Sequence, residues 1–166
     1  MTEGPIKRER TFTWSDPAGT AEMLGAGLSG YDLIKAMLDG EIPHAPIAEA
    51  LDFQLHEVER GRVVFRSRPQ EFHYNPIGTV HGGFYGTLLD SCMSCAIHTM
   101  LDGGKGYTTL EYKINLVRAL SDDVGEIFAE GNLVHLGRRI ATADGRVVDA
   151  AGKLYAHGTV TCIILS

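Results

Sequence analysis

The sequence is poor in positive charge. Its 166 residues include 15 Lys and Arg against 21 Asp and Glu, which gives a net charge of -6. A protein that binds nucleic acid normally presents a basic face to the phosphates, so no nucleic-acid partner is expected. An anionic ligand would have to bind at a local basic patch.

Long hydrophobic runs are also missing. No apolar stretch reaches the ~18–20 residues of a membrane-crossing helix, because Asp90 and several Ser and Thr residues interrupt the longest candidate, 84–101. Residues 1–14 mix basic with acidic side chains and contain no hydrophobic block, which a secretory signal requires. We therefore expect a cytoplasmic protein with no membrane partner.

Cysteines are few. Three is an odd number, and without an export signal it favours reduced thiols over disulfide bonds. Cys92 and Cys95 form a C-x-x-C pair, but the pair lies deep within a helical pattern of apolar residues, whereas a redox pair normally lies where a helix begins. Zinc would need further ligands nearby. We interpret both residues as buried structural thiols and expect no metal site.

What the sequence does contain is the composition of an ordinary soluble globular protein, 44% hydrophobic and 22% charged. Residues 1–45 are interpreted as an N-terminal extension with one short helix, predicted over Tyr31 to Asp39. Gly25, Gly27 and Gly30 spell G-x-G-x-x-G before that helix. A dinucleotide-binding turn of this form follows a buried strand, which the preceding residues do not provide, so a flexible loop is predicted instead.

Residues 46–166 predict an α+β domain in which five or six antiparallel strands wrap one long helix. Strands are predicted at 53–59, 62–68, 107–117, 126–135, 139–147 and 154–165, one helical turn at 47–50, and the long helix at 82–100. The core stripe of the long helix is predicted to be Leu89, Met93, Ala96, Ile97 and Met100. A bulge or break is expected at 143–145, where Asp-Gly interrupts a strand pattern.

Asp90 is unusual because it lies eight residues into an apolar helix, where a carboxylate is costly unless it is paired or put to use. Gly83, Gly86 and Ser94 share its side of the helix, and their small size leaves room for a ligand or a second backbone. Spacing alone leaves two interpretations open: a functional acid, and an Asp hydrogen-bonded to structure.

The start of the same helix offers a complementary group. At His81-Gly82-Gly83, backbone N–H groups aided by the helix dipole could polarise a thioester carbonyl and stabilise the oxyanion that forms. Gly82 and Asp90 are about 12 Å apart along one helix, too far to act on one carbonyl carbon. A two-fold dimer with two such helices side by side would bring Asp90 of one subunit near Gly82 of the other.

The segment 75–90 reads N-x-x-G-T-x-H-G-G-x-x-x-T-L-x-D. It closely resembles the hot-dog-fold thioesterases of the phenylacetate-pathway type and their acyl-CoA relatives, and the flanks 107–119 and 125–166 look similar as well. The resemblance implies a hot-dog fold over 46–166 and hydrolysis of an acyl-CoA without metal or other cofactor. It also implies a homodimer with shared active sites that pairs into a dimer of dimers.

The resemblance further implies roles for particular residues. Asp90 would be general base or nucleophile, acting through water attack or a transient anhydride, and both mechanisms stay open. Gly82 would supply the N–H that polarises the carbonyl, with Gly83 beside it, and Asn75 and His81 would orient the substrate and the departing thiolate.

Water and coenzyme A need further partners. Thr109, with Thr108 as the next choice, would hold the attacking water. Arg138 and Arg139 follow a glycine at a strand edge where the family binds coenzyme A, so they are candidates for its phosphates. Arg118 and Lys113 are weaker candidates, and His98, His135 and His157 are expected to be structural or exposed.

Two other functions remain. A hot-dog hydratase or dehydratase would place a different His and acid around the helix. A non-catalytic acyl-CoA-binding protein would keep the fold and lose the acid, so the presence of Asp90 favours the enzyme. The sequence leaves the acyl group open among aromatic, short and medium-length chains.

Overall fold

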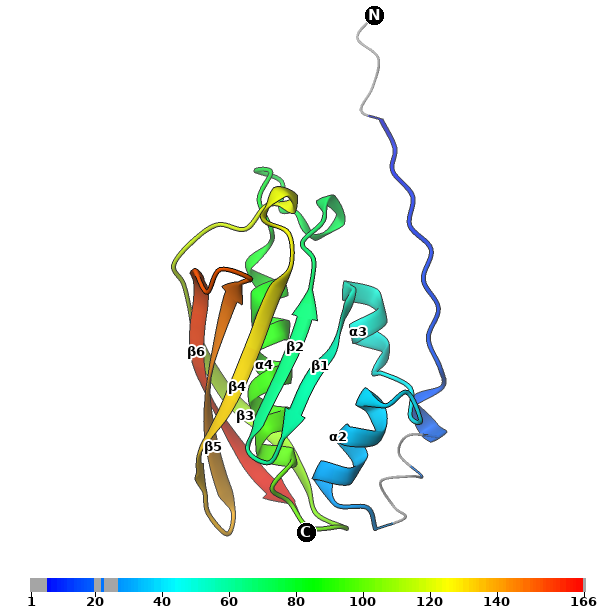
Figure 1. Cartoon of the computed structure of the whole chain (residues 1–166), viewed down its shortest axis with the longest axis vertical. Coiled ribbons are helices and arrows are strands. Elements are labelled where there is room, and N and C mark those ends of the chain that lie inside the picture. Colours follow the sequence, from blue (N-terminus) through cyan, green and yellow to red (C-terminus); the bar gives the residue numbers. More distant parts are fainter. Residues whose placement is uncertain (1–5, 20–21, 23–26, 166) are drawn as a thin grey trace, which may run out of the picture.

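The structure is a computed structural model that describes residues 6–19, 22 and 27–165. One antiparallel sheet, with strand order β1-β2-β4-β5-β6-β3, curves around a long helix, α4 (Figure 1). The strands are β1 (Phe53–Glu59), β2 (Arg62–Ser67), β3 (Gly106–Leu116), β4 (Ile127–Leu136), β5 (Ile140–Asp149) and β6 (Leu154–Leu165). The helices are α2 (Gly30–Leu38), α3 (Pro46–Leu51) and α4 (Gly82–His98), with short 3-10 turns η1 (Glu71–His73) and η2 (Asp122–Val124). The predicted α+β class is confirmed.

The predicted elements are all present, with ends within about two residues, the usual spread of helix and strand boundaries. The expected bulge or break at 143–145 is wrong, because β5 pairs without interruption there with both β4 and β6. Gly145 is instead a close-approach site, since a Cβ on it would lie 2.7 Å from Cγ of Met93. The strand carries glycine there so that the helix can pack against it.

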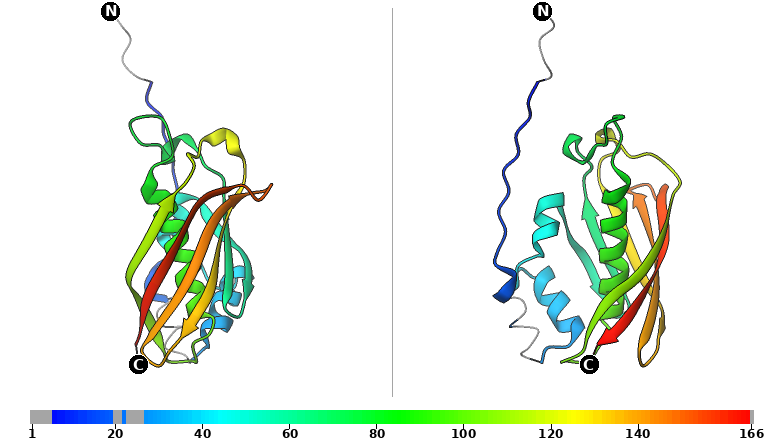
Figure 2. Two further views of the ribbon diagram at one scale, coloured as in Figure 1. Left: turned by 90° about the vertical axis from the view of Figure 1, so that its left-hand side faces the viewer. Right: turned by 180° about the vertical axis from the view of Figure 1, so that it is seen from behind.

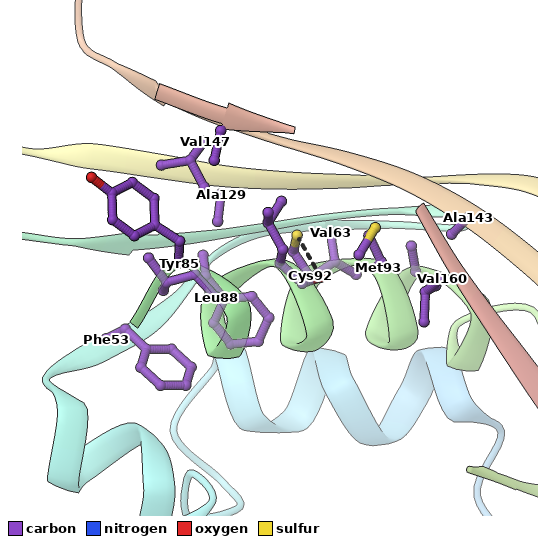
Figure 3. Close-up of a cluster of buried hydrophobic side chains, with 14 of the residues drawn as sticks. Phe53, Val63, Tyr85, Leu88, Cys92, Met93, Ala129, Ala143, Val147 and Val160 are labelled. Carbon is purple, nitrogen blue, oxygen red and sulfur yellow. Dashed lines mark hydrogen bonds between the residues drawn. The ribbon is translucent and has the colours of Figure 1, made fainter. Parts of the chain in front are cut away.

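The core lies between α4 and the sheet. Figure 3 shows Leu88, Cys92 and Met93 of α4 facing strand residues such as Val63 and Ala129. The predicted stripe is confirmed: four of its members are fully buried and Met100 is partly buried. A Cβ on Gly131 of β4 would lie 2.3 Å from the Cys92 carbonyl group, so the helix backbone rests directly on this strand.

Helices α2 and α3 lie beside α4 and cover β1 (Figure 2). Gly30, the first residue of α2, donates its N–H to the Leu101 carbonyl at 3.0 Å, and a Cβ on it would collide with His98. Glycine therefore lets α2 pack directly against the end of α4. Of the G-x-G-x-x-G pattern, Gly25 lies outside the described residues.

The outer face of the sheet carries an ion-pair network. Glu130 of β4 accepts hydrogen bonds from Arg62 at 2.6 Å and from Arg146 at 2.8 Å, and Arg62 also contacts Glu57. The network joins β1, β2, β4 and β5. None of the described helices is both long and apolar enough to cross a bilayer.

Candidate active site

The start of α4 is capped by His81. Its ring Nδ1 accepts the Gly83 N–H at 2.9 Å, so Nε2 carries the hydrogen of the neutral ring. Among the described residues the Gly82 N–H has no acceptor. The cap therefore occupies the N–H of Gly83 and leaves that of Gly82 open at the positive end of the helix dipole.

Asn75 organises the loop that leads to His81. Its side-chain oxygen accepts the N–H groups of Ile77 and Thr79, and its side-chain nitrogen donates to the Thr79 hydroxyl at 2.9 Å. Gly78 has a φ of +83°, which favours glycine at this turn. In this chain Asn75 shapes the loop beside the helix start through its own side chain.

Asp90 is partly exposed and accepts a hydrogen bond from the Thr109 hydroxyl at 3.0 Å. Thr109 lies on β3, the strand that follows α4, and was the residue predicted to hold the attacking water. The structure therefore brings Asp90 and Thr109 together. Within the described residues no Lys, Arg or His forms a salt bridge with Asp90.

A β-bulge positions Thr109. The pairing of β3 with β6 shifts between Thr109 and Glu111, so Leu110 is the extra residue. Before the bulge the odd-numbered residues Tyr107 and Thr109 face α4, and after it the even-numbered Tyr112, Ile114 and Leu116 do so. Without the shift, one half of the strand would face away from the helix.

The Asp90 carboxylate opens into a cavity of about 530 Å³. One wall comes from α4 and β3, with Asp90, Ser94, His98, Tyr107 and Thr109. The opposite wall is mostly apolar and comes from α2, the residues just before α3, α3, β1 and β2; its members are Leu33, Ile34, Met37, His44, Ala45, Ile47, Ala48, Phe53, Leu55 and Phe65. Thr108 also lines the cavity, although its side chain is largely exposed.

Several polar residues of this cavity were not predicted as site residues, namely His44, Ser91, His98 and Tyr107. Ser94, which was predicted to share the Asp90 side of the helix, and His98 follow Asp90 at steps of four residues, so all three lie along one side of α4. That spacing was the available signal for His98, which was instead expected to be structural or exposed. His98 is only 8% exposed, and burial lowers the pKa of its imidazole, which keeps the ring neutral near pH 7.

The cysteines lie near the cavity as thiols. Cys92 is buried, as predicted, whereas Cys95 is only partly buried because it lines the cavity. Burial is the main cause that raises the pKa of the Cys95 thiol to about 12, so the reactive thiolate is scarce near neutral pH. No group of three potential metal ligands occurs in the part of the chain that the structure describes.

Arg138 and Arg139 lie in a second cavity of about 730 Å³ at the turn between β4 and β5. Lys105 joins them there, paired with Asp102 at 2.8 Å. This cavity does not contain Asp90. Within one chain the structure thus brings Asp90 together with Thr109 and, at a different place, His81 together with Gly82. The basic cavity lies apart from the Asp90 cavity, and Arg118 and Lys113 line neither of the two cavities.

Comparison with known proteins gives a consistent result. The thioesterase superfamily matches residues 77–156. Human acyl-coenzyme A thioesterase 13 is 30% identical over 103 residues, which are 61% of this chain and 71% of that protein.

Solved structures agree. A phenylacetic acid degradation-related protein of Ralstonia eutropha is 26% identical with a TM-score of 0.71, over 78% of this chain and 98% of that one. A Thermus thermophilus protein is 32% identical with a TM-score of 0.65, over 72% of this chain and 97% of that one.

Proposed function

Because the chain belongs to the thioesterase superfamily and is thus a thioester hydrolase, we propose that it hydrolyses acyl-coenzyme A with Asp90 as general base or nucleophile. The observation that carries the proposal is the Asp90 carboxylate in the lining of a largely apolar cavity, with the Thr109 hydroxyl 3.0 Å away. A cavity of this kind suits an acyl chain, and the carboxylate meets its reacting end.

The carbonyl would be polarised at the start of α4. The open Gly82 N–H points to an oxyanion site, and the neutral His81 ring offers its Nε2–H as a second donor because Nδ1 is occupied by the cap. His81 in this tautomer donates a hydrogen bond to substrate and has no free lone pair to take a proton. The base role therefore falls to Asp90.

Two routes lead to the products. In the first, Asp90 removes a proton from water held by Thr109, the water oxygen attacks the carbonyl carbon, and the C–S bond breaks as the thiolate departs and takes up the proton. In the second, the carboxylate attacks, expels the thiolate and forms an anhydride that water then cleaves. Both need the same carboxylate and the same oxyanion donor.

Since Gly82 and Asp90 are about 12 Å apart along α4, the proposal requires a homodimer in which each site combines Asp90 of one subunit with Gly82 of the other. Strand β3 supports this arrangement. It is an edge strand that no described element covers, and it exposes Leu110, Tyr112 and Leu116. The strand edge is unpaired and its exposed side chains include these large apolar ones beside Glu111 and Lys113, which allows pairing with a second copy, and such dimers could pair again into a dimer of dimers.

For the nucleotide end of coenzyme A we propose the basic cavity of Arg138, Arg139 and Lys105, where guanidinium groups can bind phosphate. Asn75 would act by fixing the loop before His81, and Gly83 by accepting the close approach of substrate. A non-catalytic acyl-CoA-binding role would leave the Asp90–Thr109 pair without a purpose.

The test is Asp90→Asn, assayed with a panel of acyl-CoA substrates and a thiol reagent. The amide keeps the shape of the carboxylate but is neither base nor nucleophile, so kcat should fall by about 10²–10⁴-fold while assembly and coenzyme A binding persist. Asp144→Asn is the matched control, because it removes the same charge from an exposed position on β5 that lines neither the Asp90 cavity nor the basic cavity. If Asp90 is only structural, the melting temperature falls and the folded fraction keeps a normal kcat, which would defeat the proposal.

A further inference from the structure

One wall of the Asp90 cavity is formed by residues that precede the part of the chain matched by the thioesterase superfamily. Helices α2 and α3 and strand β1 precede residue 77, where the match begins. They contribute the apolar side chains Ile34, Met37 and Ile47 opposite α4. The far end of the cavity is therefore a feature of this chain's own N-terminal segment.

The facing wall is polar along its whole length. Asp90, Ser94 and His98 follow one another on α4, and the Tyr107 hydroxyl stands 3.5 Å from the Ser94 hydroxyl. A cavity built only for an unsubstituted alkyl chain would gain nothing from such a row. Burying polar groups beneath a hydrocarbon leaves them without water and without a replacement partner.

His98 is the residue of this row that lies farthest from Asp90. Its ring is held between Gly30, whose Cβ would lie 2.5 Å from the ring Cδ2, and Tyr107, whose ring centroid is 5.0 Å away. The residue is only 8% exposed, and neither ring nitrogen forms a hydrogen bond with residues 6–19, 22 or 27–165. No nitrogen of the described residues is both sealed from solvent and unpaired, so the ring nitrogens of His98 stay accessible from the cavity that it lines. A neutral imidazole offers one donor and one acceptor, and both are free for a ligand.

We propose, as an extension that rests on the proposed function, that the cavity binds acyl chains of medium length with a hydroxyl near their far end. His98 is the hydrogen-bond partner of that hydroxyl. The occupant is thus a hydroxylated aliphatic acyl group, with its thioester at Asp90.

The length follows from the helix. Asp90 and His98 are eight residues apart, which is about 12 Å along the axis. The contacts of the ligand with Asp90 and with His98 are each about 3 Å long. If both contacts lie along the helix axis, about 6 Å remain for the ligand between them, and if both lie across the axis the ligand spans the full distance of about 12 Å. An extended chain advances about 3.5 Å for every three bonds, which places the hydroxyl about five to ten bonds from the carbonyl carbon.

The experiment compares octanoyl-CoA with ω-hydroxyoctanoyl-CoA in the full-length protein. An alkyl end would cover the imidazole without bonding to it, so kcat/KM should favour the hydroxylated substrate by about 5- to 150-fold. His98→Phe keeps the aromatic contact with Tyr107 and should abolish this preference, mainly by lowering the hydroxylated substrate's kcat/KM. His98→Gln keeps a donor and an acceptor and should restore part of it.

The outcomes separate the two proposals. Equal kcat/KM for the two substrates in the unaltered protein, or a preference that survives in folded His98→Phe, would overturn the role of His98 and leave thioester hydrolysis standing. Failure to hydrolyse any acyl-CoA of the panel would overturn the proposed function, and this inference with it. Because the first comparison needs no variant, a misfolded His98→Phe protein would not remove the test.

Discussion

Replacing Gly131 by Ala tests how closely the site-bearing helix rests on the sheet. The added Cβ would lie 2.3 Å from the carbonyl carbon and oxygen of Cys92 and 2.5 Å from the Met93 nitrogen. These are backbone atoms of α4, which cannot turn away as a side chain can. The helix must therefore lift at the turn that follows Asp90.

The expected cost is set by overpacking, which typically amounts to about 1–3 kcal/mol. The clash with backbone places Gly131→Ala at the upper end, and for a chain of this size about 3 kcal/mol lowers the melting temperature by about 6–12 °C. Gly145→Ala meets the flexible Met93 side chain at 2.7 Å and a backbone atom, the Glu130 carbonyl oxygen, only at 3.1 Å, so we expect a smaller loss of about 1–2 kcal/mol. Gly106→Ala, whose nearest neighbour is Leu165 Cβ at 3.8 Å, is the matched control and should stay within about 0.5 kcal/mol.

The assay is thermal unfolding followed by circular dichroism, together with acyl-CoA hydrolysis at a temperature where each variant is folded. Because Cys92 follows Asp90 by two residues, the lifted helix should also separate the carboxylate from Thr109 and lower kcat in Gly131→Ala. A melting temperature for Gly131→Ala equal to that of Gly106→Ala would refute the direct contact of helix and strand.

Two further predictions concern assembly and pH. Lys in place of both Leu110 of β3 and Val117, the exposed apolar residue that directly follows β3, should dissociate the dimer and abolish activity. Sedimentation and hydrolysis assays would show both effects. Lys at the exposed Val134 of β4 should do neither, and a persistent dimer would contradict the β3 interface. Burial, the largest influence, raises the pKa of Glu130, but its two arginine partners outweigh it and the pKa lies below the usual value. The stabilisation by ionised Glu130 is complete above the ordinary glutamate pKa and is lost as pH falls through the lowered pKa. Glu130→Gln should therefore lower the free energy of unfolding by about 1 kcal/mol at pH 7, and its unfolding free energy in urea should vary less with pH than that of the unaltered protein between about pH 5 and 3. An equal pH dependence of the two proteins would contradict this role of Glu130.

The periodicity of apolar residues in the sequence predicted much of the fold. Alternating β-branched residues and an apolar helical stripe are local signals, and they predicted every strand and the long helix. The Asn75–Asp90 motif is also local, because its residues follow one another along a loop and a single helix. It therefore predicted candidate site residues on the loop and the helix without any knowledge of the sheet.

The features that the sequence did not predict depend on packing between residues far apart in the chain. The bulge at Leu110 depends on the register between β3 and β6, and no residue of β3 marks it. Gly145 was interpreted as a break because the reason for the glycine, the nearby Met93, lies about fifty residues earlier in the sequence. His98 was set aside for the same reason, since its place in the cavity depends on α2 returning to pack against the end of α4.

The change of facing residues at Leu110 determines which alterations in length β3 can accept. Deleting a residue from a surface loop shortens a connection and leaves each side chain facing as before. Deletion of a paired residue of β3 such as Lys113 would instead turn the rest of the strand over, so that Asn115 would face α4 and Ile114 and Leu116 would face away. Deletion of the unpaired Leu110 would leave Thr109 and Glu111 opposite their successive partners Cys162 and Thr161, and Tyr112 would still face α4. Residue 110 is thus a position at which β3 can lose a residue without turning its side chains over. Related chains of this architecture should vary in length at this position and at the turns around β3, while the paired stretches on either side keep their lengths.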